Sequence, residues 1–181
     1  MMWRNTHDGY GLVSIALHWL VALAVTGLFV LGLWMVELGY YHRWYQRAPD
    51  IHKSVGVLLF GVMLARFAWR YSNPRPEALG SAMQRKLAAW VHRMLYTLMT
   101  MLMLSGYLIS TADGRGIPVF GLFSLPASIS GLQNQADIAG KLHEWLAFAL
   151  IALTTLHALA ALKHQLVDRD QTLKRMLNLK P

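Results

Sequence analysis

The chain has 181 residues, of which 55% are hydrophobic and 14% are charged, and its formal net charge is +8 at pH 7. The low charged fraction argues against an ordinary soluble domain, in which about 25% of residues are charged. The absence of cysteine excludes disulfides, thiolate zinc sites, iron–sulfur clusters and covalently attached c-type haem. Any metal site must therefore use histidine, methionine or carboxylate ligands.

Four long stretches with few or no charges predict an all-α integral membrane protein. Residues 9–36, 94–112 and 145–162 contain no charged side chain, and each run approaches the roughly 20 apolar residues that span a bilayer. A shorter run, 54–65, reaches a similar length if Arg66 lies within the membrane. Helices satisfy their own backbone hydrogen bonds, as lipid requires. We predict one transmembrane domain, residues 1–181, that forms a bundle of four helices near 12–36, 51–71, 90–110 and 143–164.

The positive charges are unevenly distributed around these helices. Lysine and arginine are frequent in residues 70–86 and in the C-terminal tail, whereas residues 111–142 carry only Arg115 and Lys141. Because positively charged loops are retained in the cytoplasm, we expect both termini to be cytoplasmic. Residues 37–51 and 111–142 then form the outward loops. This distribution favours membrane lipid, and not nucleic acid, as the partner of the positive charge.

Four histidines lie at two matching depths in the predicted helices. His143 and His157 are 14 residues apart, which is close to four full helical turns, so both project from one face of the last helix, about 21 Å apart. His18 lies in the first helix at a depth similar to that of His157, whereas His52 begins the second helix on the outer side, as His143 begins the fourth. We therefore predict an inner pair, His18 with His157, and an outer pair, His52 with His143.

Two imidazoles that face each other among apolar helices favour the axial ligands of a haem. A bare zinc or copper ion would need further ligands, and the spans offer no cysteine or nearby carboxylate. A porphyrin supplies four nitrogens of its own, and small residues one turn after each histidine leave room for it; these are Ala22, Gly56, Ala147 and Ala161. The alternative is four histidines that act as polar links between helices, but two consistent depths are hard to obtain by chance.

Three basic side chains are candidates to bind the haem propionates. Arg66 follows His52 by 14 residues, which places it on the same helix face at the level of the inner pair. We expect it to bind a propionate of the inner haem, although an arginine can also extend its side chain to the lipid headgroups. Lys53 and Lys141 are the corresponding candidates for the outer haem.

Two further histidines are expected near the inner haem. His92 is the strongest competitor for the inner iron, but it begins the third helix and should lie nearer the membrane surface than His157, at the depth of His164. We interpret His92 and His164 as neighbours of the inner haem that bind a propionate or a quinone carbonyl. The alternative is that both are interfacial histidines without a special role.

The sequence resembles the bacterial cytochrome b561 family and is similar to the b-type cytochrome subunits of nickel–iron hydrogenases and formate dehydrogenases. The likeness covers nearly the whole chain and rests on IALHWL (15–20), IHKSVG (51–56), LHEWLA (142–147), LHALAALKH (156–164) and DQTLKRM (170–176). It implies a four-helix membrane cytochrome with two non-covalent haems b, each held by two histidines. The family ligands fall on the same four histidines that depth alone brings together.

The resemblance also implies electron exchange with the quinone pool, and some members are described as oxidising superoxide at the outer face. Because two histidine ligands leave no open position on the iron, the haems should carry electrons and not bind oxygen. We therefore expect an oxidoreductase of the respiratory chain that moves electrons between an outer donor, with superoxide one candidate, and membrane quinone. The sequence singles out no catalytic residue.

Two other functions fit parts of the pattern. The same haems can serve a membrane anchor subunit, in which case a partner redox subunit of a larger dehydrogenase or hydrogenase-type complex replaces the small donor. A histidine-lined metal or proton transporter would carry no haem, and it would need more acidic and amide side chains in the spans than the sequence provides.

Overall fold

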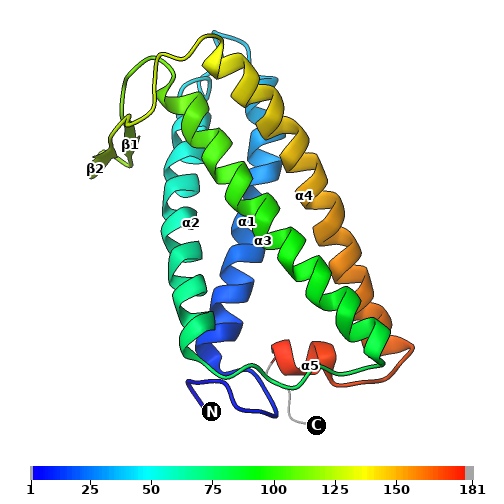
Figure 1. The fold of residues 1–181 in the computed structure, drawn as a ribbon. Coiled ribbons are helices and arrows are strands. Elements are labelled where there is room, and N and C mark those ends of the chain that lie inside the picture. Colours follow the sequence, from blue (N-terminus) through cyan, green and yellow to red (C-terminus); the bar gives the residue numbers. More distant parts are fainter. Residues whose placement is uncertain (1, 178–181) are drawn as a thin grey trace. The chain divides into compact units, whose positions relative to one another are not determined.

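The computed structural model describes residues 2–177, so Met1 and the last residues of the expected domain 1–181 lie outside the described part (Figure 1). The described chain is mostly helical, with a two-stranded hairpin between the third and fourth helices. The elements are α1 (Leu12–Val36), α2 (Arg47–Ser72), α3 (Ala82–Thr111), β1 (Ile117–Val119), β2 (Phe123–Leu125), α4 (Gln135–Leu166) and α5 (Thr172–Leu177). Helices α1 to α4 are each long and apolar enough to cross a membrane, which confirms the predicted fold class.

Three of the long helices begin earlier than their apolar runs predicted. Helix α2 begins at Arg47, α3 at Ala82 and α4 at Gln135, because polar residues outside lipid can still form a capped first turn. The backbone N–H of Gln84 donates to Ser81 Oγ at 3.3 Å, and the backbone N–H of Ser81 donates to Gln84 Oε1 at 2.7 Å. This reciprocal capping box starts α3 well before the membrane crossing.

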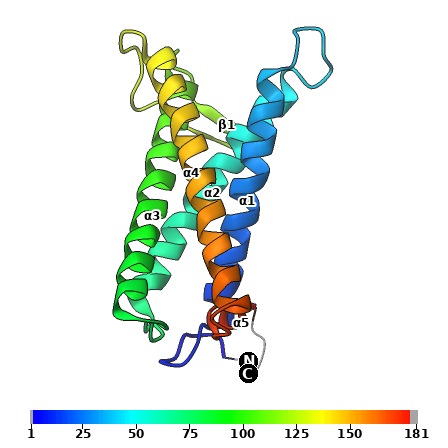
Figure 2. The same cartoon turned by 90° about the vertical axis from the view of Figure 1, so that its right-hand side faces the viewer.

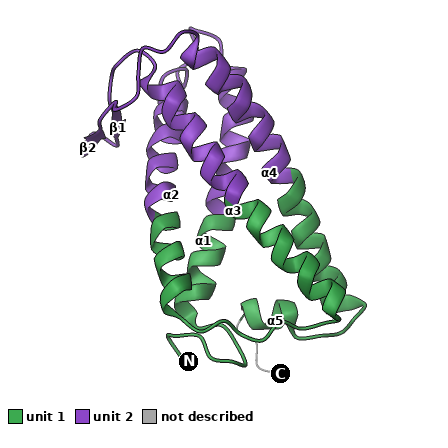
Figure 3. Cartoon of the chain, viewed as in Figure 1, with its two compact units in different colours: residues 1–22, 62–96, 152–181 green, residues 23–61, 97–151 purple. Residues whose placement is uncertain are grey.

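The chain divides into two compact units, and each contains sections of all four long helices (Figure 3). Unit 1 comprises residues 1–22, 62–96 and 152–181, and it includes α5. Unit 2 comprises residues 23–61 and 97–151, and it includes the hairpin.

Large apolar side chains are exposed on the long helices. In unit 2, Leu23 is 71% exposed and Trp145 is 75% exposed, whereas Leu150 is buried. In unit 1, Leu64 is exposed and Met63 beside it is buried. Apolar surface of this extent is unfavourable in water but suits lipid, and the four long helices therefore make the chain a multi-pass membrane protein.

The hairpin of unit 2 is fastened to α2. Strands β1 and β2 are antiparallel, and Ile117 pairs with Leu125. The hydroxyl of Ser54 donates to the carbonyl of Pro118 at 3.3 Å and accepts a hydrogen bond from the backbone N–H of Phe120 at 3.1 Å. Because Ser54 lies two residues after His52, these bonds fix the hairpin beside the start of α2.

In unit 1, the N-terminal segment and α5 lie at the same end (Figures 1 and 2). The indole N–H of Trp19 in α1 donates to the carbonyl of Met176 in α5 at 2.9 Å. The guanidinium of Arg175 donates to the carbonyl of Glu77, also at 2.9 Å. These contacts hold the short α5 against the ends of the longer helices.

Candidate functional site

The outer pair comes together in unit 2. His52 lies in the second turn of α2 and His143 in the third turn of α4, and their ring centroids are 6.2 Å apart with the ring planes at 69°. The structure thus brings together the two histidines that the depth argument paired.

The inner pair comes together in unit 1 with almost the same geometry. The ring centroids of His18 in α1 and His157 in α4 are 6.4 Å apart, and the ring planes make an angle of 68°. Two metal–imidazole bonds of about 2 Å each would place two ring centroids roughly 6 Å apart. Each pair therefore has the spacing of two imidazoles on opposite sides of one metal ion.

A third imidazole lies beside the inner pair. The ring centroid of His92 in α3 is 5.2 Å from that of His157, with the planes at 65°. This shorter distance is typical of an edge-to-face contact between rings and leaves less room for an ion between them. The separations favour His18, and not His92, as the ring opposite His157.

The proton of His143 is fixed by a carbonyl group. His143 Nδ1 lies 3.0 Å from the carbonyl oxygen of Leu102 and 3.0 Å from Ser105 Oγ, and the Ser105 hydroxyl itself donates to that carbonyl at 2.8 Å. Since a carbonyl oxygen can only accept, Nδ1 carries the proton. The lone pair of Nε2 is then free, which is the form in which a histidine binds a metal.

Glycines of two other helices bring their backbones against the outer pair. A Cβ at Gly106 in α3 would lie 3.1 Å from His143 Cε1, and a Cβ at Gly32 in α1 would lie 3.4 Å from His52 Cε1. A Cβ at Gly56, one turn after His52, would meet no described atom within 4 Å. The rings are thus held closely on one side, and α2 leaves open space beside His52.

His52 Nδ1 is buried and has no hydrogen-bond partner among the described residues. A buried polar atom without a partner costs about 1–3 kcal/mol. A group that binds the same ring through its other nitrogen would offset this cost. The orphaned nitrogen, the free Nε2 of His143 and the open space beside Gly56 fit a haem between these two rings.

Arg66 lies against His18 of the inner pair. Its Nη2 is 3.1 Å from His18 Nδ1, its Nε donates to the Tyr96 hydroxyl at 3.1 Å, and its Nη1 donates to the Leu17 carbonyl at 3.4 Å. A guanidinium can only donate, so in this arrangement a neutral His18 carries its proton on Nε2. To bind a metal through Nε2, His18 needs Arg66 to turn from Nδ1 toward another acceptor, and a propionate is such an acceptor.

The two lysines expected near the outer haem have different surroundings. Lys53 Nζ lies 3.0 Å from Asp50 Oδ1, three residues earlier in α2, whereas Lys141 is exposed at the side chain. In the loop before the hairpin, the side chain of Arg115 hydrogen-bonds to Asp113 and thereby lowers the pKa of that carboxyl. Lys53 and Arg115 are therefore each paired with an aspartate.

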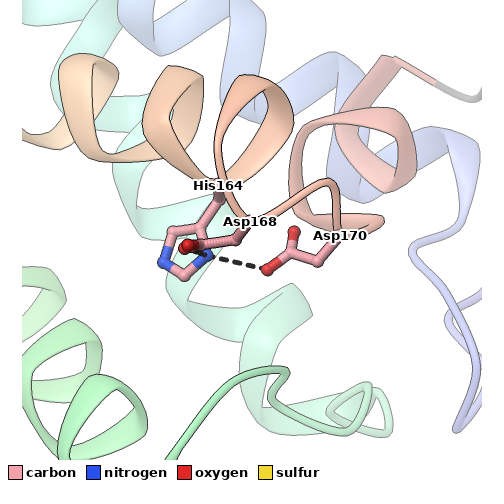
Figure 4. Close-up of side chains that lie close together, drawn as sticks. All are labelled: His164, Asp168 and Asp170. Atoms are coloured by element: carbon pink, nitrogen blue, oxygen red, sulfur yellow. Dashed lines mark hydrogen bonds and ion pairs between the residues drawn. The ribbon is translucent and has the colours of Figure 1, made fainter.

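His164 in the last turn of α4 meets two carboxylates (Figure 4). Its Nδ1 is 2.7 Å from Asp170 Oδ2 and 3.2 Å from Asp168 Oδ2. The donor atoms of the three side chains lie within 4.8 Å of one another, as a metal site requires. However, Lys163 Nζ already lies 2.7 Å from Asp168 Oδ2, so these contacts form a network of ion pairs.

Asp170 also caps α5. Its Oδ1 accepts a hydrogen bond from the backbone N–H of Thr172 at 2.8 Å. Burial raises the pKa of the Asp170 carboxyl, but the hydrogen bonds from Thr172 and His164 outweigh it, and the pKa lies below its ordinary value. The end of α4 and the start of α5 thus share one carboxylate.

Sequence reasoning missed several residues that contact the histidine pairs or Arg66. Ser105 and Gly106 interrupt the apolar run of α3, and a polar side chain within a span was the available signal. Nothing in the sequence marks Gly32 or Tyr96, because their contacts depend on how α1 and α3 are rotated about their axes.

The chain is similar in sequence to known proteins of one family. The family model described as prokaryotic cytochrome b561 matches residues 9–179. The chain is 49% identical to cytochrome b561 homolog 2 of Escherichia coli K12 over 179 residues, which cover 98% of this chain and 95% of that protein. It is 33% identical to the probable superoxide oxidase CybB of Yersinia pestis, over 94% of this chain and 97% of that protein.

A third relative, cytochrome b561 homolog 1 of Escherichia coli K12, is 28% identical over 91% of this chain and 94% of its own length. The family match extends over nearly all of the described helices, and all of these relatives are matched over most of their lengths. The chain therefore belongs to the prokaryotic cytochrome b561 family and is a membrane electron-transfer protein of the haem b type.

Proposed function

We propose that the chain binds two haems b and moves electrons between a donor at the outer face of the bacterial inner membrane and quinone in the lipid. His18 and His157 would hold the inner haem iron, and His52 and His143 the outer haem iron. The observation that carries the proposal is the recurrence of one geometry: two pairs of imidazoles, 6.4 and 6.2 Å between centroids, with ring planes at 68° and 69°.

A haem b with two imidazole ligands takes up and releases one electron at its iron and has no open position for oxygen. The residues of this chain provide position and charge. His143 presents a free Nε2 because Leu102 and Ser105 hold its Nδ1 proton. Arg66, which contacts His18, would turn to a propionate and neutralise it in a region of low dielectric.

For quinone we propose a site near His92 and His164. Both histidines belong to unit 1, where His92 contacts His157 and His164 is bonded to Asp170. The carboxylates face Nδ1 of His164 and hold a proton there, so a hydrogen bond to the quinone group would use Nε2. In the neutral ring Nε2 accepts a hydrogen bond from a quinol hydroxyl, and a ring that carries both protons donates one to a quinone carbonyl.

The Yersinia pestis relative is named a probable superoxide oxidase, which supports superoxide as the outer donor. Superoxide is a small anion, and positive groups near a site attract it. Lys141 is exposed in unit 2 and is the candidate for this role, whereas Lys53 and Arg115 are paired with acids. We place both termini in the cytoplasm because lysine and arginine are concentrated in residues 70–86 and in the tail.

The decisive experiment is haem quantitation on the purified protein by pyridine haemochrome together with a reduced-minus-oxidised spectrum. We expect two haems b per chain, and His18→Ala and His143→Ala should each remove one and leave the other. His42→Ala, in the outward loop, is the matched control and should keep both. If both ligand variants keep two haems, the ligand assignment is wrong.

A further inference from the structure

Within the proposed di-haem function, we propose that the inner site has the higher reduction potential because of Arg66, and the outer site the lower one because of the hydrogen bonds that His143 makes to Leu102 and Ser105. The two histidine pairs have nearly identical geometry but opposite polar surroundings. One electron would then move downhill from the outer site, which is oxidised, to the inner site, which is reduced.

The inner pair has a permanent positive charge beside it. The Arg66 guanidinium lies 3.1 Å from a ring nitrogen of His18, and the partners of its hydrogen bonds, His18, Tyr96 and the Leu17 carbonyl, carry no negative charge. Arginine stays protonated in proteins. A fixed positive charge disfavours the more positive, oxidised state of a neighbouring iron, and the effect is strong where the dielectric is low.

This effect does not depend on which acceptor Arg66 uses. Arg66 must turn away from Nδ1 when His18 binds a metal through Nε2, because a guanidinium and a protonated Nδ1 can both only donate. If Arg66 turns to a propionate, it cancels a negative charge that would otherwise favour the oxidised state. Arg70, whose guanidinium lies 5.5 Å from the ring centroid of Tyr96, adds charge of the same sign to unit 1.

The outer pair has the opposite surroundings. The Nδ1 proton of His143 is directed at the Leu102 carbonyl and the Ser105 hydroxyl, and Ser105 is only 1% exposed. A ligating histidine that donates its other N–H to an acceptor becomes a stronger electron donor to the metal. This favours the oxidised state of the iron. The nearest expected cation, Lys53, is paired with Asp50.

The test is a potentiometric titration of the purified holoprotein, followed by absorbance. The single-haem variants His18→Ala and His143→Ala identify which potential belongs to which site. We expect two separable potentials, the higher at the inner site. If the inner potential is equal to or below the outer one, the proposal is wrong, although two haems per chain would still support the proposed function.

Two substitutions test the named causes. Arg66→Gln should lower the inner potential and leave the outer one unchanged, and Arg66→Lys, which keeps the charge, should restore most of the shift. Ser105→Ala should raise the outer potential alone, whereas Ser110→Ala, which removes a hydroxyl that donates to the carbonyl of Gly106 in its own helix, should change neither. Unchanged potentials in Ser105→Ala would contradict the role of the His143 hydrogen bonds at the outer site. An inner potential in Arg66→Lys equal to that of Arg66→Gln would contradict the role of the Arg66 charge.

Discussion

The backbone of Gly106 lies directly against the imidazole of His143: a Cβ added at Gly106 would be 3.1 Å from Cε1 and 3.4 Å from Nδ1. Such contacts are too short for the ring to keep its place. The closeness also explains how α3 can offer both a carbonyl and a hydroxyl to the same ring, since only a residue without a side chain allows the helix to approach so near.

We therefore expect Gly106→Ala to displace His143 and weaken binding of the outer haem. Overpacking of this kind costs about 1–3 kcal/mol. The measurement is the number of haems per chain after purification, together with the unfolding temperature. Gly27→Ala in α1 is the control, because a Cβ there meets no described atom within 4 Å and alanine is the better helix former by about 0.5–1 kcal/mol. Equal haem content in the two variants would refute the steric argument.

His92→Gln should leave two haems per chain. The ring of His92 is in edge-to-face contact with His157, and the separation of 5.2 Å is shorter than in either proposed ligand pair. Pyridine haemochrome quantitation checks this, with His18→Ala as the comparison. Loss of one haem in His92→Gln and retention of both in His18→Ala would make His92 the ligand opposite His157.

Ser54→Ala should loosen the hairpin without unfolding α2. Ser54 is 2% exposed, and its hydroxyl bonds to Pro118 and to the backbone N–H of Phe120. Loss of the hydroxyl removes both of these hydrogen bonds, each worth about 0.5–1.5 kcal/mol. Hydrogen exchange should become faster in residues 117–125 and stay unchanged in α4. Ser72→Ala, at the exposed end of α2, should have no effect on the hairpin.

Stability of α5 should depend on pH through Asp170. The pKa of Asp170 is lower in the folded protein than in the unfolded chain, so its contribution is complete above the unfolded pKa of about 3.9 and is lost as the pH falls through the folded value. At pH 7, Asp170→Ala should reduce hydrogen-exchange protection of residues 172–177 by the equivalent of about 1 kcal/mol, as expected for a lost cap.

Asp170→Asn separates the cap from the charge, because its side-chain oxygen can still accept from Thr172 while the attraction to His164 is lost. At pH 7 we expect the hydrogen-exchange protection of residues 172–177 in Asp170→Asn to lie between that of the wild type and that of Asp170→Ala. Below the folded pKa the wild type loses the contribution of its charge and should approach Asp170→Asn, whose cap does not depend on pH. If Asp170→Ala matches the wild type at pH 7, the carboxylate does not hold the start of α5.

Much of this geometry could be predicted from helix periodicity. A 14-residue interval is nearly four turns, so it places two side chains on one face whatever the neighbouring helices do. The structure brings His52 together with His143 in one unit, and His18 together with His157 and Arg66 in the other, as the intervals led us to expect. The predicted starts of α2, α3 and α4 were too late in the sequence. An apolar run shows only the part of a helix that crosses the membrane, and these helices have further turns outside it.

The hydrogen bonds of the site could not be predicted from the sequence. Whether Ser105 faces His143 depends on the rotation of α3, which is set by packing against other helices. The partners of His164 depend on a loop in which Arg169 has φ 54°, in the left-handed region that non-glycine residues rarely adopt. This turn brings Asp168 and Asp170 to the same ring, and no periodic pattern encodes it.

The attachment of the hairpin at Ser54 limits how the start of α2 can change in length. Ser54 and His52 share one helix, so the bonds from Ser54 to Pro118 and Phe120 set the rotation of the His52 ring as well. One residue inserted between them would rotate the imidazole by about 100° about the helix axis and direct it away from His143. The two-residue spacing within IHKSVG is therefore a register that insertions and deletions should not be able to alter without loss of the outer pair.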